Sequence, residues 1–400
     1  MSGIELHAAG VAVSIHERSD RVLDDRGAGI VMQPGTLGIL TGRCGLKENQ
    51  TGVWLRFRQY LGKDGAIELH QAMPQLMTSW GLLYQAFRSA FPASEYRQGD
   101  ALLAFELGKS GVTCRFERSG QIHADLLVGA DGSRSLVREV LFPRVKPRYA
   151  GYVAWRGIVN ETQAGPELLK TFGDHFTFQQ LSHSHILCYL LPGPNGEAMP
   201  GERRLNWVWY WNVPETRLAD VMTGMDGKAR DFSMPPGHIK RDIISTQQAI
   251  AERVLCPQFL ALWEATKEPF LQPILDLSVP KMYVGRAALI GDAAFIPRPH
   301  TAASTSKAAS NAIALGEALQ HHSDDVEAAL AAWEPSQLYL GQRLEAHGQA
   351  LGNRSTIFHV NLARAILNYE QVKNRNLLRP NLPVVLHRKA ADAGGIEALG

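Results

Sequence analysis

Hydrophobic and polar residues alternate in several stretches of the chain, and this alternation predicts antiparallel β-strands. The clearest examples are VWLRFRQYL (53–61) and GAIELHQAM (65–73). Residues 101–132 alternate in the same way around two tight turns, Lys-Ser-Gly and Arg-Ser-Gly, and predict a β-meander. Helical periodicity predicts helices over 82–91, 243–255, 257–265, 304–320 and 324–351.

Aromatic residues are concentrated in the middle of the chain, from about Tyr149. The segments YAGYVAWRGIV (149–159), FTFQQLSHSHILCYLLPG (176–193) and RRLNWVWYWNV (203–213) are long and rich in Trp and Tyr. We expect them to form a separate antiparallel sheet. Since strand side chains alternate between two faces, Trp209 and Trp211 must point away from Tyr210.

The N-terminus has the pattern of the second half of a βαβ unit. Residues 1–10 read as the end of a helix that Gly10 terminates, and residues 11–19 read as a short strand. We therefore expect the strand and glycine loop that precede such a helix to be missing from this chain. Glu17 ends the strand where dinucleotide-binding folds place a ribose-binding carboxylate, although a solvated charge is the simpler alternative.

Composition excludes several classes of protein. The 400 residues are 45% hydrophobic and 20% charged with a net charge of +2, and they contain no basic patch of the kind that binds nucleic acid. The four cysteines form no CxxC pair, so we expect free thiols, no metal cluster and a cytoplasmic location. No segment resembles a signal peptide or a membrane span.

The first motif with chemical content is GADGSRSLVREVL (Gly129–Leu141). An apolar strand leads into Gly-Ala-Asp-Gly and then into a helix, an arrangement that favours an anionic pyrophosphate. Asp131 can cap the helix, and Arg138 can pair with Asp131 or with phosphate. The alternative is an ordinary strand, turn and capped helix.

The second motif is ALIGDAAFIPRPHTAASTSKAAS (Ala288–Ser310). A buried strand delivers Asp292 to a loop that Pro297 and Pro299 stiffen. The helix that follows begins with small residues, which allow its amides to approach a flat ring and to stabilise negative charge at its edge.

Together these two motifs resemble the group A flavoprotein monooxygenases, the para-hydroxybenzoate hydroxylase superfamily. The segments 149–157, 205–213 and 290–303 are similar to its 2,6-dihydroxypyridine 3-monooxygenase branch. The resemblance extends from Gly10 to about Leu351. It implies an α/β fold with a Rossmann-like FAD-binding domain, an inserted antiparallel substrate-binding sheet and a helical C-terminus.

The resemblance also implies a set of domain boundaries. The expected ranges are an FAD-binding part at 1–148, the substrate-binding sheet at 149–280, a second FAD-binding part at 281–345 and a helical tail at 346–400.

By the same resemblance the protein binds FAD without a covalent link, takes electrons from NAD(P)H and hydroxylates a ring through a flavin hydroperoxide. Glu17 then matches the ribose carboxylate and Arg18 the residue beside the adenine, with Gly29 near the pyrophosphate. Asp131 and Gly132 match a motif that serves both FAD and the nicotinamide. The remaining matches are Asp292 at the ribityl chain, Pro299 beside the isoalloxazine, and Ala302 and Ala303 at its pyrimidine edge.

Four residues depart from the family pattern: Phe295 replaces a common His, Ser304 a Gly, Asn311 an acidic residue, and Gly27 an arginine that relatives use for the cofactor. These departures and the absent glycine loop leave a second hypothesis open, an inactive or weakly FAD-binding relative that binds a ligand or partner. A flavin oxidase or halogenase is less favoured.

The family places its substrate under the aromatic sheet, and the candidate catalytic residues are His300 and Tyr210. The other candidate lining residues are Tyr152, Trp155, His183, His185, Trp209 and Trp211. A titratable imidazole at position 300 is expected to deprotonate a phenol or hydroxypyridine, with capping of the next helix as the alternative. The expected partner is a small aromatic or hydroxypyridine-like substrate, and the sequence leaves open a homodimer and the choice between NADH and NADPH.

Overall fold

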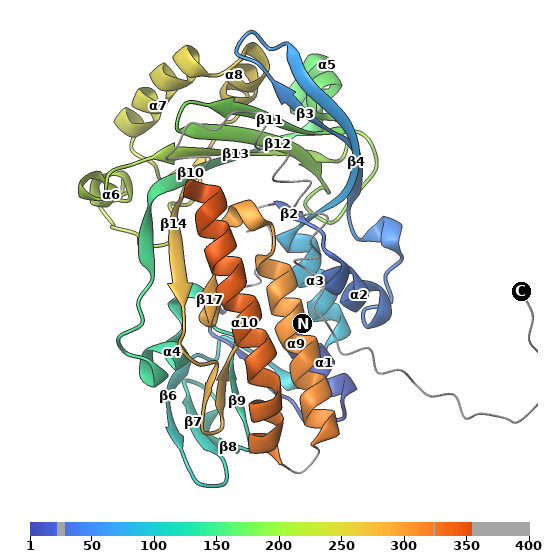
Figure 1. The fold of residues 1–400 in the computed structure, drawn as a ribbon, viewed down its shortest axis with the longest axis vertical. Coiled ribbons are helices and arrows are strands. Elements are labelled where there is room, and N and C mark those ends of the chain that lie inside the picture. The colour runs from blue at the N-terminus through green and yellow to red at the C-terminus, as the bar shows by residue number, and fades with distance from the viewer. Residues whose placement is uncertain (22–28, 323–324, 354–400) are drawn as a thin grey trace, which may run out of the picture. The chain divides into compact units, whose positions relative to one another are not determined.

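The alternating segments form a nine-stranded sheet in the order β17-β14-β10-β13-β12-β11-β3-β4-β2 (Figure 1). The computed structural model describes residues 1–21, 29–322 and 325–353. Neighbouring strands are antiparallel except for the parallel pair β3 and β11. The strands are β2 (Gly29–Val31), β3 (Val53–Leu61), β4 (Ile67–Ser79), β10 (Arg148–Asn160), β11 (His175–Leu181), β12 (Ser184–Leu191), β13 (Arg204–Asn212), β14 (Phe270–Ser278) and β17 (Phe295–Ile296).

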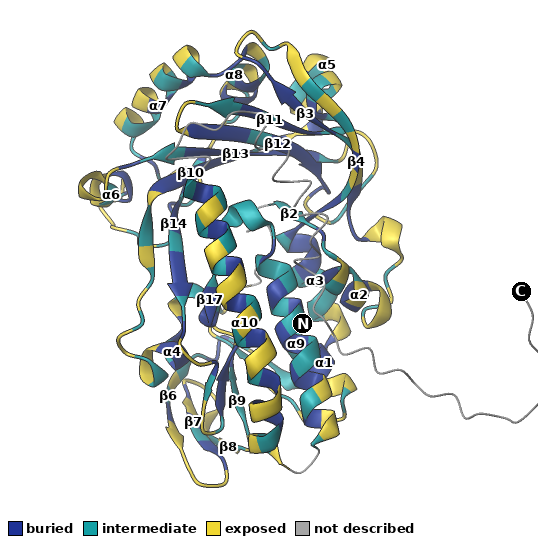
Figure 2. Ribbon diagram, in the orientation of Figure 1, coloured by how far each residue is buried: buried dark blue, intermediate teal, exposed yellow. Residues whose placement is uncertain are grey.

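One face of this sheet is covered by helices and holds the largest hydrophobic core. Trp155, Trp207 and Trp209 are buried there with residues of α5 (Glu161–Phe172), α7 (Arg241–Val254) and α8 (Pro257–Glu264). Figure 1 shows these helices on one side of the sheet, and Figure 2 shows the central strands buried. The tryptophans therefore stabilise the fold from the helical side.

The opposite face carries a different set of side chains. Ala154 and His185 both pair with Tyr210, so these three side chains share a face, and Tyr152 and Arg156 follow by alternation along β10. The predicted separation of Trp209 and Trp211 from Tyr210 is confirmed.

Short parallel strands carry the nucleotide-type motifs, as expected. After α1 (Ser2–Ala8) and Gly10, whose φ is +83°, β1 (Ile15–Glu17) pairs with β5 (Tyr96–Gln98). Separately, β16 (Ala287–Leu289) lies between β9 (Leu127–Gly129) and β15 (Tyr283–Val284). Within the described residues, no strand connects these two small sheets.

The predicted meander is confirmed as β6 (Leu102–Leu107), β7 (Val112–Phe116) and β8 (Gly120–Ala124). Two long helices, α9 (Ser304–His321) and α10 (Val326–Gly352), pack side by side (Figure 1). The remaining helices are α2 (Pro34–Gly42), α3 (Trp80–Ala90), α4 (Leu136–Leu141) and α6 (Glu215–Val221).

The large sheet is wider than the range 149–280 expected for it, because β2, β3 and β4 join it from residues 29–79. Of the expected tail, α10 covers 346–352, and residues 354–400 lie outside the described chain. The four cysteines are free, as predicted. None of the described helices has the length and apolarity to cross a bilayer.

Candidate active site

Two glycine-containing loops leave adjacent parallel strands and meet at one edge of the small sheet. Gly129 of β9 is paired with Leu289 of β16, so the loops that follow start side by side. Gly132 and Gly291 have φ values of +72° and +60°, in the left-handed region that favours glycine. The loops therefore have backbone shapes that a residue with a side chain would adopt only with strain.

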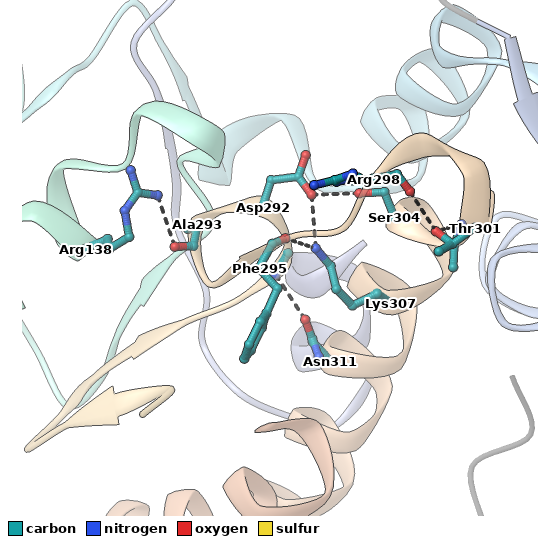
Figure 3. A network of polar contacts seen from close by, with 11 residues as sticks. Arg138, Asp292, Ala293, Phe295, Arg298, Thr301, Ser304, Lys307 and Asn311 are labelled. Atoms are coloured by element: carbon teal, nitrogen blue, oxygen red, sulfur yellow. Dashed lines mark hydrogen bonds and ion pairs between the residues drawn. The ribbon is translucent and has the colours of Figure 1, made fainter. Parts of the chain in front are cut away.

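Arg138 links these two loops. Its buried guanidinium donates to the carbonyl of Ala293 at 3.1 Å (Figure 3) and to that of Ser133 at 2.7 Å. The sequence predicts that Arg138 pairs with Asp131 or with phosphate; its hydrogen bonds go to these two carbonyls, and burial lowers its pKa while Asp131 lies near enough to act in the opposite direction. Asp131 accepts the Val137 amide at 3.2 Å, which confirms the predicted capping of α4.

Asp292 lies in the second loop and is held by the first turn of α9. Its Oδ1 accepts from Ser304 Oγ at 2.8 Å and from Lys307 Nζ at 3.0 Å (Figure 3). Lys307 also donates to the Phe295 carbonyl, and burial lowers the pKa of this lysine. Sequence reasoning missed Lys307, although a lysine in a helical turn of small residues was a visible signal.

Asn311 explains one departure from the family pattern, whereas Gly27, another departure, lies outside the described residues. Its Oδ1 accepts the Gly291 amide at 3.0 Å, and its Nδ2 donates to Gln337 of α10 at 2.9 Å. The amide side chain thus fixes the second loop to both long helices.

The start of α9 has free backbone amides, the feature expected beside a ring system whose edge carries negative charge. No side chain caps this helix: Ala303 is the N-cap residue, and Ala302 has a φ of +51°. Pro299 opens the short 3-10 turn η5 (Pro299–Thr301) before it. The Asp292 side chain is 46% exposed and keeps room to accept a hydroxyl. Uncapped amides and an open carboxylate are donors and acceptors that fit a flavin and its ribityl chain.

The remaining candidate cofactor residues lie elsewhere. Glu17 ends β1, where its carboxylate accepts the Ser19 amide at 2.7 Å, and Arg18 is exposed. Gly29 opens β2 and packs against the ring of Tyr189; a Cβ at Gly29 would lie 2.5 Å from that ring. The structure thus groups Asp131, Gly132 and Asp292 but places Gly29 on the large sheet.

His300 connects the second loop to the open face of the sheet. Its Nε2 lies 2.8 Å from the hydroxyl of Tyr152, and its ring centroid is 4.4 Å from that of Tyr210 and 5.2 Å from that of His185. Burial lowers the pKa of His300 well below its ordinary value, and His185 and Arg298 act in the same direction. The capping alternative is wrong, since no side chain caps α9.

A buried ion pair supports Tyr152 from the other side. Arg298 donates to both oxygens of Asp276, at 2.9 and 2.8 Å, and to Asn353 at 2.7 Å. Burial raises the pKa of Tyr152 far above its ordinary value, so the phenol keeps its proton. The phenol keeps its proton and the imidazole is unprotonated, so the Tyr152 O–H can donate to His300 Nε2, an arrangement that places the ring N–H on Nδ1.

Four candidate lining residues must be corrected. Trp155 and Trp209 are buried in the core against α8, and the rings of Trp211 and Trp209 pack edge to face. His183 is exposed in the turn between β11 and β12. The alternation along the strands puts these tryptophans on one face of the sheet, but the sequence did not show that helices cover that face.

Comparison with known proteins agrees with this geometry. The chain is 31% identical over 346 residues to the 2,6-dihydroxypyridine 3-monooxygenase of Paenarthrobacter nicotinovorans, covering 85% of this chain and 84% of that protein. It belongs to the group A FAD-dependent aromatic hydroxylases. The FAD binding domain-like family matches residues 149–276.

Two further relatives place the chain within the family. The structure of 2,6-dihydroxypyridine-3-hydroxylase from Arthrobacter nicotinovorans superposes with a TM-score of 0.83 at 30% identity, covering 89% of each chain. The phenazine 1,6-dicarboxylic acid hydroxylase PhzS of Lysobacter antibioticus is 26% identical over 82% of this chain and 81% of its own. Membership makes the protein an FAD-dependent oxidoreductase of the monooxygenase type, with NAD(P)H as the reductant typical of the family.

Proposed function

We propose that this hydroxylase acts on a small hydroxylated N-heteroaromatic ring of the hydroxypyridine type. The observation that carries the proposal is the contact of His300, from the loop that follows Asp292, with Tyr152 and Tyr210 on the open face of the sheet. Polar groups of the large sheet and of the loop between β16 and α9 meet there. Support comes also from the relatives, which are named for hydroxypyridine and phenazine substrates.

The residues proposed to hold FAD come from several elements. Asp131, Gly132 and Asp292 serve its polar chain, Pro299, Ala302 and Ala303 its ring system, and Glu17 with Arg18 its adenosine half; Gly29 is proposed for the adjoining region. When bound, FAD supplies the oxygen activation that NAD(P)H and dioxygen drive in this family. Arg138 and Asn311 keep the two loops in place for it.

The chain's own groups orient the ring. His300 presents an Nδ1–H donor, because its Nε2 accepts from Tyr152. Tyr210 is a second neutral donor, since burial raises its pKa to about 12. An imidazole with a strongly lowered pKa is a weak base, so we assign His300 the role of donor and orienting group in place of the deprotonating role expected from the sequence.

The proposal is tested by NAD(P)H consumption. The FAD-loaded protein is expected to oxidise NAD(P)H faster when 2,6-dihydroxypyridine is present than when it is absent. His300→Ala removes the Nδ1–H donor and should reduce the stimulation about tenfold, equivalent to one hydrogen bond, while it still binds FAD. If the ring leaves the wild-type rate unchanged, the proposed substrate class is wrong.

The other hypothesis, an inactive relative that binds a ligand or partner, is not favoured, because the relatives are enzymes. A cytoplasmic location and a homodimer belong to the proposal as predictions. Gel filtration against mass standards checks the dimer.

A further inference from the structure

A buried arginine lies on the face of the sheet that the proposed active site occupies. Arg156 follows Tyr152 and Ala154 along β10, and its partner across the sheet is Val208, two residues from Tyr210. Its side chain therefore points to the same side as Tyr152, Tyr210 and His185. Only 9% of its surface is exposed.

Arg156 has no charge partner in the described part of the chain. Its Nε is buried without a hydrogen-bond acceptor, and no described carboxylate is within ion-pair distance. Burial raises the pKa values of two nearby phenols, Tyr210 and Tyr189, while the guanidinium acts on them in the opposite direction. A buried guanidinium without an anion is costly, so such a group points to a ligand that supplies the anion.

A second unpaired donor lies on the same face. Asn206 is fully buried, and its Nδ2 has no acceptor, although its Oδ1 accepts the Gly29 amide at 3.4 Å. Asn206 is paired with Tyr189 on β12 and with Ile158 on β10, two residues along the strand from Arg156. Two unsatisfied donors on one face favour a ligand that brings acceptors.

The other charged groups near this face are already neutralised or neutral. Arg298 is paired with both oxygens of Asp276. Tyr152 and Tyr210 keep their protons, and His300 is unprotonated. Of these groups and Arg156, Arg156 is thus the charged one with no carboxylate beside it among the described residues, and none of them is a good base.

We propose that Arg156 selects the substrate by binding a ring oxygen that is already deprotonated, so that the site takes up the monoanion of a hydroxylated ring from solution. This assignment rests on the proposed function. It removes the need for a base in the site, because the proton is lost to water before binding. It also increases the electron density of the ring that is to be hydroxylated.

The test uses 4-nitrophenol, whose phenolate absorbs differently from the phenol, bound to the FAD-loaded protein. We expect the wild-type protein to lower the apparent pKa of the bound phenol by at least about one unit, a tenfold preference for the anion. Arg156→Gln should abolish this shift, and Arg156→Lys should restore most of it. The matched control is Arg58→Gln, because Arg58 is a buried arginine of the same sheet that donates to Gln75.

Three outcomes overturn the assignment. The first is a wild-type protein that leaves the pKa of the bound phenol unchanged, and the second is an Arg156→Gln variant that lowers that pKa as much as the wild type does. The third is an Arg156→Gln variant that no longer binds FAD, because Arg156 would then be a cofactor-binding residue. A different result separates the two proposals. If Arg156 lowers the pKa of the bound phenol but no hydroxylated ring accelerates NAD(P)H oxidation, the proposed hydroxylation is refuted and the anion-binding site is retained.

Discussion

At the scale of single residues, the site depends on which atoms carry protons. His300 is neutral, and its Nε2 accepts from a phenol that Arg298 also contacts. This arrangement fixes the tautomer of the imidazole and directs its remaining N–H to one place. The neutral state of His300 is thus due to its burial, to His185 of β12 and to Arg298 of the loop itself, and Tyr152 of β10 is its hydrogen-bond partner.

Removing the Tyr152 hydroxyl tests this arrangement. Tyr152→Phe keeps the buried ring but frees His300 Nε2, so we expect about a tenfold loss of hydroxylation rate, equivalent to one hydrogen bond, with FAD affinity unchanged. Tyr149→Phe is the matched control, because the Tyr149 hydroxyl donates to the Val213 carbonyl, a different acceptor. Equal effects in both variants would contradict the account.

The lowered pKa of His300 also predicts how stability depends on pH. Below the ordinary pKa of histidine the unfolded chain binds a proton that the folded chain does not. The free energy of unfolding should therefore fall with decreasing pH, by up to about 1.4 kcal/mol per unit below about pH 6.5. Thermal melting of wild type and His300→Asn between about pH 8 and about pH 5 measures it. A variant with the same pH dependence as the wild type would disprove this contribution.

At the scale of elements, α9 organises the cofactor loop through three side chains. Ser304 and Lys307 hold Asp292, and Asn311 holds the Gly291 amide. The loop is thus tied to the first two turns of one helix, and Asn311 ties that helix to α10.

Substitution of Asn311 tests this support. Asn311→Leu leaves the buried Gly291 amide without an acceptor and should lower the free energy of unfolding by about 1–3 kcal/mol, together with FAD affinity. Asn311→Asp keeps a carboxylate oxygen for that amide and should retain most of both. Denaturant unfolding and flavin fluorescence titration measure the two quantities; a Leu variant as stable as wild type would refute the role.

Elements with a clear period could be predicted from the sequence, and contacts between distant elements could not. The alternation in 203–213 predicted that the side chains of Tyr210 and Trp209 lie on opposite faces of the sheet. The Gly-Asp pair after a buried strand predicted that Asp292 lies in a loop before α9. Lys307 was missed, and Asn311 was noted only as a departure from the family pattern, because their partners depend on how the loop approaches the helix. Arg156 was missed because an unpaired charge is recognised only when all its neighbours are known.

At the scale of the whole molecule, the nine-stranded sheet separates two functions. Its helical face holds the tryptophan core, and its other face presents Tyr152, Arg156 and Tyr210. Hydrophobic pattern alone did not reveal that β2, β3 and β4 complete this sheet, because strand pairing between distant segments is decided by tertiary packing. Folding thus stabilises one face and leaves polar groups available on the other.

The central claim is that this hydroxylase inserts one oxygen atom from dioxygen into a hydroxypyridine-type ring. The most direct test is a reaction of the FAD-loaded protein with 2,6-dihydroxypyridine and NAD(P)H under ¹⁸O₂, followed by mass spectrometry of the product. The account predicts a product that contains one ¹⁸O atom, formed in step with NAD(P)H oxidation. Oxidation of NAD(P)H without a labelled product, or a product labelled only from water, would contradict it.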